Sequence, residues 1–146
     1  LQEYAAEPVD MAKVMKMVLL HDLVEIDAGD TFAYDPEAGL DKEERETTAA
    51  DRLYGMLPSD QGQELRTLWD EFEARETPEA KFAACLDRLQ PLLNNYHTAG
   101  GTWQTHGVSS GQVRKRMEPV GEGAPCLGDL VERLIQEAIA QGILQE

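Results

Sequence analysis

The sequence has few cysteines, no long apolar run and no leader-like start. Its two cysteines, Cys85 and Cys126, form neither a disulfide framework nor a CxxC pair. No apolar run approaches the ~20 residues that span a bilayer; the run at Met17–Leu20 is cut off by His21. No segment combines a charged start with the apolar centre of a signal peptide. We therefore expect a cytoplasmic protein that does not associate with membranes.

Basic residues are also scarce. The 146 residues include 13 Lys and Arg against 28 Asp and Glu, a formal net charge of −15. A field of this sign repels polyanions, which argues against binding nucleic-acid polymers or anionic membranes through a basic surface. A small anionic substrate fits only where a local cation, most simply a metal ion, reverses the potential. With 42% hydrophobic residues, the chain is long enough to form one folded domain over residues 1–146.

Helical periodicity dominates the chain, and no stretch alternates as a strand does. Thr77-Pro78-Glu79 is a strong helix start, because it places a capping hydroxyl before a proline at the first helical position. Six helices are predicted. The first begins at residues 8–10 and ends at residues 23–25. The others cover residues 42–57, residues 59–72 with Ser59 as the cap, residues 78–97, residues 109–110 to 117, and a last helix that includes residues 130–139. The segment around His106 and the Gly/Pro-rich segment 121–128 are predicted to be loops. The fold class is all-α.

Ionisable residues continue the apolar stripe of the first predicted helix. That stripe consists of Met11, Val14, Met15 and Val18. Steps of three and four residues extend it to His21, Asp22 and Glu25, and ionisable groups on an inward face are costly unless they are paired or bind a metal. On a regular helix His21 and Glu25 are stacked, with Asp22 about 100° round the axis from His21. Alternatively, the stripe simply meets solvent there beside a hydrogen-bonded histidine.

A later helix carries a similar anomaly at Asp87. A face of small residues leads to this carboxylate, and Pro91, four residues later, leaves the Asp87 carbonyl without its helical donor and predicts a kink. A functional site and a surface aspartate beside Arg88 both fit this pattern. The indole rings of Trp69 and Trp103 are predicted to pack in the interior. An acidic face is predicted to be solvated; it consists of Glu43, Glu44 and Glu46.

Residues 20–31, Leu-His-Asp-Leu-Val-Glu-Ile-Asp-Ala-Gly-Asp-Thr, resemble the central motif of the HD-domain metal-dependent phosphohydrolase superfamily. The branch that they resemble most is the 5′-deoxynucleotidase-like one. The resemblance implies an HD-domain helical bundle that holds one divalent metal ion through His21, Asp22 and Asp87. The family's first histidine ligand has no match here, so we expect it before Leu1, on an N-terminal helix that this chain lacks.

The resemblance further implies that Glu25 and Asp30 are the acid and base of catalysis, in an order that the sequence leaves open. A mixed nitrogen and oxygen ligand set suits Mn, Co or Fe, and is also compatible with Zn, Ni, Cu or Mg. The implied reaction is hydrolysis of a phosphomonoester, most plausibly a 5′-(deoxy)nucleoside monophosphate, by a homodimer. The alternative is a non-catalytic HD-fold module that binds or scaffolds partners through helix-mediated dimerisation.

Overall fold

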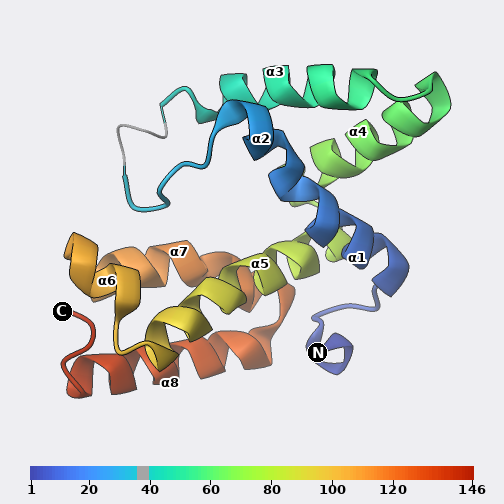
Figure 1. Ribbon diagram of the computed structural model, residues 1–146. Coiled ribbons are helices and arrows are strands. Elements are labelled where there is room, and N and C mark those ends of the chain that lie inside the picture. The colour runs from blue at the N-terminus through green and yellow to red at the C-terminus, as the bar shows by residue number, and fades with distance from the viewer. Residues whose placement is uncertain (36–39) are drawn as a thin grey trace.

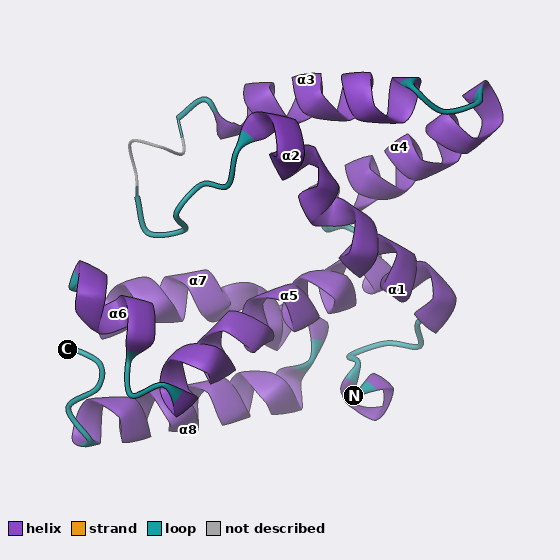
Figure 2. Ribbon diagram, in the orientation of Figure 1, coloured by secondary structure: helices purple, strands orange, loops and turns teal. Residues whose placement is uncertain are grey.

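The computed structural model describes residues 1–35 and 40–146, and within them the fold is all-α, as predicted (Figures 1 and 2). None of the helices described is both long and apolar enough to cross a membrane. In chain order the elements are η1 (Gln2–Tyr4), α1 (Met11–Leu20), η2 (His21–Val24), α2 (Glu25–Ala28), α3 (Lys42–Gly55), α4 (Ser59–Ala74), α5 (Pro78–His97), α6 (Gly101–His106), α7 (Ser110–Gly123) and α8 (Pro125–Ala140), where η denotes a 3-10 helix.

Helix α5 is the central element of the fold. It packs against α1, α4, α7 and α8, and Figure 1 shows α5, α7 and α8 running side by side, with α3 and α4 paired on the other side of α1. Phe82 and Cys85 of α5 are fully buried in the main core with Ile135 of α8. A second, smaller cluster joins Val24 and Trp69 under α3. Phe72 of the main core and Trp69 of the second cluster both line the cleft described below.

Side-chain caps define three of the helix starts as predicted. Asp10 accepts hydrogen bonds from two backbone amides in the first turn of α1. Thr77 caps α5 with Pro78 at the first helical position, and Ser109 forms a capping box with Gln112 at the start of α7. The prediction that Ser59 caps α4 is wrong, because this residue lies inside the first turn and its side chain makes no capping bond.

The predicted loops contain more helix than expected. His106 ends the short helix α6, and its ring lies 4.4 Å from that of Phe32. Helix α7 continues past residue 117 to Gly123, and α8 begins at Pro125, so only Ala124 separates them. The reason is that Pro125 starts a helix rather than ending one, since the first helical position needs no amide hydrogen.

The close contact between α5 and α7 depends on Gly123. A Cβ at this position would overlap the carbonyl oxygen of Lys81 and approach Cβ of Cys85 to 2.9 Å. We therefore expect Gly123→Ala to lower the free energy of unfolding by about 1–3 kcal/mol, because the helices must separate. The control Gly121→Ala adds its methyl group where nothing lies within 4 Å and should raise stability by up to about 1 kcal/mol. Equal urea midpoints for the two variants would contradict this packing argument.

Candidate metal centre

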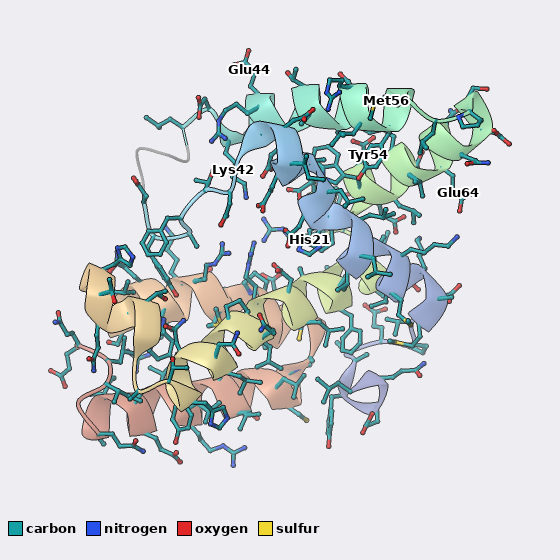
Figure 3. All side chains as sticks on the ribbon, in the orientation of Figure 1. His21, Lys42, Glu44, Tyr54, Met56 and Glu64 are labelled. Atoms are coloured by element: carbon teal, nitrogen blue, oxygen red, sulfur yellow. The ribbon has the colours of Figure 1, made fainter. Side chains whose placement is uncertain are left out.

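The helix type changes from α to 3-10 at His21. Helix α1 ends at Leu20, η2 spans His21–Val24, and α2 begins at Glu25. The prediction of one uninterrupted helix to residues 23–25 is therefore wrong. A 3-10 turn has about three residues per turn, so the stacking of His21 over Glu25 expected from α-helical geometry does not apply. Figure 3 shows His21 between this segment and α5.

The ring of His21 joins the two segments that carry the candidate ligands. Its Nδ1 lies 2.9 Å from the carbonyl oxygen of Val18, and because a carbonyl only accepts, Nδ1 carries the proton. Its Nε2 lies 3.0 Å from Oδ1 of Asp22 and 3.2 Å from Oδ1 of Asp87. When the ring is neutral, the lone pair of Nε2 faces the two carboxylate oxygens of Asp22 and Asp87. Three electron-pair donors then meet at one point, which requires a proton or another cation between them.

The short distances between His21 and the two carboxylates shift the pKa values of His21 and Asp87. Burial of the His21 ring opposes its protonation, but the hydrogen bond to Asp87 and the charge of Asp22 outweigh this effect and raise the pKa of His21. Burial likewise opposes ionisation of Asp87, yet the hydrogen bond from His21 and the guanidinium of Arg88 lower the pKa of Asp87. The surroundings therefore favour an ionised carboxylate and a positive charge beside it.

The five predicted site residues line one cleft of about 830 Å³. His21, Asp22, Glu25 and Asp30 come from the first third of the chain, and Asp87 comes from α5. Glu25 is half-buried. Burial, followed by the charges of Asp22 and Asp30, raises the pKa of Glu25 above its ordinary value. A carboxyl group that holds its proton to higher pH is suited to acid–base chemistry.

The donor set fits a divalent ion in its chemistry. Two donors on adjacent corners of an octahedron, each about 2.1 Å from the ion, are about 3.0 Å apart, close to the two distances measured from Nε2 of His21. The hydrogen bond from Nδ1 to the carbonyl oxygen of Val18 also fixes the orientation of the ring, as such hydrogen bonds do for metal-bound histidines. Across residues 1–35 and 40–146, however, no group of three or more such side chains is already arranged as a complete metal site.

Comparison with known proteins identifies the family. The family described as "HD domain" matches residues 1–127. The chain belongs to the HD domain family. It is 34% identical over 85 residues to the 5′-deoxynucleotidase HDDC2 of Danio rerio, and 33% identical over 81 residues to that of Homo sapiens. These matches cover 58% and 56% of this chain, and they span only 42% and 40% of the two relatives.

A solved structure is similar over nearly the whole chain. It is the crystal structure of a protein described as a "Predicted metal-dependent phosphohydrolase" from Magnetospirillum magnetotacticum MS-1. The TM-score is 0.92 at 51% sequence identity, with 99% of this chain and 74% of that chain covered. The arrangement of helices described above is therefore an HD domain arrangement.

The acidic face predicted on the helix over residues 42–57, which is α3, is only partly solvated in this HD domain. Glu43 and Glu44 are exposed as predicted, but Glu46 exposes only 5% of its surface. Glu43 lines the same cleft, so the difference lies in the partner: Nζ of Lys42, one turn earlier on α3, lies 3.3 Å from Oε1 of Glu46. Trp69 is buried, as predicted.

One end of the cleft is basic, a feature that was not predicted from the sequence. Arg75 follows α4, Arg88 lies on α5 and Arg116 on α7, and all three line the cleft with the predicted acidic residues. Nη1 of Arg88 donates to Oδ2 of Asp87 at 2.8 Å. Only the adjacency of Arg88 to Asp87 is visible in the sequence, because the other two arginines come from distant helices.

Proposed function

We propose that this HD domain is the catalytic domain of a metal-dependent phosphohydrolase that cleaves a phosphomonoester, namely a 5′-(deoxy)nucleoside monophosphate. The convergence of Asp22 and Asp87 on Nε2 of His21 carries this proposal. The relatives named 5′-deoxynucleotidase support the substrate class, and the phosphohydrolase description of the similar crystal structure supports the reaction.

In this proposal His21, Asp22 and Asp87 hold one divalent ion, with Mn, Co or Fe favoured by the mixed nitrogen and oxygen donors. When bound, such an ion polarises a phosphoryl oxygen and lowers the pKa of a water molecule. Within this chain, Val18 orients the imidazole through Nδ1, and Arg88 orients the second oxygen of Asp87. These contacts keep the donor atoms of the two residues turned toward the cleft.

Glu25 and Asp30 are proposed to move the protons of the reaction. Both line the cleft beside Asp22, within electrostatic reach of one another. One carboxylate takes the proton of the attacking water, and the other group, protonated, gives a proton to the leaving alkoxide. Because its pKa is raised, Glu25 holds its proton to higher pH than an ordinary glutamate does, whichever of the two steps it serves.

Chelation and metal add-back test this proposal. We expect the full-length protein to release phosphate from 5′-deoxynucleoside monophosphates, to lose this activity in EDTA, and to regain it with Mn²⁺ or Co²⁺. The corresponding 3′-monophosphates serve as the matched substrates. Hydrolysis that is unaffected by EDTA, or no hydrolysis of any 5′-monophosphate with either ion, would reject the proposed reaction.

A further inference from the structure

Positive charge gathers at one end of a cleft in a strongly acidic chain. Arg88 and Arg116 line the cleft of the candidate metal centre and also a second cavity of about 760 Å³ that adjoins it. Arg75 and Lys115 line this second cavity as well. Four basic side chains line this second cavity against three acidic ones, Asp35, Glu118 and Glu122. In a chain with 13 Lys and Arg against 28 Asp and Glu, this is a local reversal of the charge balance.

The charge of Arg116 is poorly compensated by the protein. This residue is half-buried, and no hydrogen bond or ion pair of its guanidinium is found in the part of the chain that the structure describes. Burial and the neighbouring charge of Arg88 both lower the pKa of Arg116, while the charge of Asp87 opposes this effect. The carboxylates near this pair are Asp87 and, on the side of Arg88, Glu73. Because neither is hydrogen-bonded to Arg116, its guanidinium keeps an unmet demand for negative charge.

Asp87 connects this basic end to the candidate metal centre. Its Oδ1 faces Nε2 of His21, and its Oδ2 accepts from Nη1 of Arg88. A group bound beside Asp87 can therefore meet the arginines and the metal ligands together. Guanidinium groups suit a phosphoryl group, because their planar fork donates two parallel hydrogen bonds to its oxygens and stays charged at every relevant pH.

We propose that Arg88 and Arg116 bind the non-bridging oxygens of the phosphoryl group. The phosphoryl group of the ester then lies between the acidic end of the cleft, which carries the candidate metal ligands, and its basic end. This inference rests on the proposed function, which it deepens by assigning the phosphate-binding residues. Arg116 is the better residue to test, since Arg88 also supports Asp87. A phosphoryl group is anionic before and during the reaction, so loss of Arg116 should raise KM more than it lowers kcat.

The test compares Arg116→Gln with Arg114→Gln. Both substitutions remove one positive charge from α7, but Arg114 points to an exposed pair with Glu132 of α8. Inorganic phosphate is the probe, measured as a competitive inhibitor of the metal-loaded full-length protein and by ³¹P NMR titration of the metal-free protein. We expect Arg116→Gln to weaken phosphate binding and to raise KM by about tenfold or more, and Arg114→Gln to leave both within about twofold.

The NMR titration separates this inference from the proposed function, because it needs no turnover. If no monophosphate is hydrolysed but Arg116→Gln alone weakens phosphate binding, the arginine site stands and the reaction is wrong. If hydrolysis occurs and the two variants bind phosphate equally, the assignment of Arg116 is overturned. Should Arg116→Gln fail to fold by circular dichroism, Arg116→Met removes the charge but keeps a long apolar side chain, and phosphate affinity equal to that of the wild type would overturn the assignment.

Discussion

Replacing Asp87 with alanine is expected to abolish metal-dependent phosphatase activity while leaving the protein helical. The substitution removes one proposed ligand, and it also removes the partner of both His21 and Arg88. A bound metal ion contributes several kcal/mol to stabilising a phosphoryl-transfer transition state, so kcat/KM should fall on the order of 10³-fold or more. Steady-state kinetics with added Mn²⁺ and far-UV circular dichroism measure the two parts of this expectation.

The matched control for this variant is Asp129→Ala. Asp129 is an exposed carboxylate on α8, outside the cleft of the candidate metal centre. Its removal changes the net charge equally and should leave kcat/KM within about twofold. Full activity of the Asp87 variant would show that this carboxylate is not a ligand, whereas equal losses in both variants would indicate a general effect of charge.

The second large effect is expected for Glu25→Gln. Glutamine keeps the size of the side chain but can neither take nor give the proton, so kcat should fall by about 10²–10⁴-fold. Metal affinity should change little, since Glu25 is not one of the proposed ligands. Single-turnover rates and Mn²⁺ titration of the same sample distinguish a chemical defect from loss of the ion.

The pH profile then assigns the role of Glu25, whose pKa is raised by burial and by Asp22 and Asp30. As a general acid it is active below this pKa, and the rate falls as the pH rises through it; as a base the rate falls as the pH drops through it. The limb due to Glu25 should be absent in Glu25→Gln. Glu43→Gln is the control, because it removes an exposed carboxylate from the same cleft. Unchanged kcat in Glu25→Gln would exclude a proton-transfer role.

Local sequence signals predicted most of the helices and also the residues that line the candidate site. Asp10 and Thr77 define helix starts through contacts within one turn, which a sequence pattern can reveal. The motif at residues 20–31 and the anomaly at Asp87 pointed to groups that do line one cleft. Their roles as ligands and as acid and base remain predictions, since neither the geometry nor the relatives test them individually.

The features that the sequence did not reveal depend on contacts between distant segments. The 3-10 turn at His21–Val24 follows apolar residues typical of a continuing helix, so local periodicity overestimated the length of α1. Burial of Glu46 depends on how α3 packs beside the cleft. The meeting of Arg88 with Arg116 depends on the packing of α5 against α7. Each of these requires the tertiary arrangement, which propensity and spacing do not contain.

We propose that His21, Asp22 and Asp87 share one divalent cation, and Mn²⁺ binding followed by electron paramagnetic resonance measures that ion itself. Protein-bound Mn²⁺ loses the sharp signal of the free ion, so the stoichiometry can be read without any substrate. We expect one tightly bound ion per chain of the full-length protein, a loss of that ion in His21→Ala and in Asp87→Ala, and its retention in Asp129→Ala. Undiminished binding in both ligand variants, or no bound ion in the wild type, would contradict this proposal.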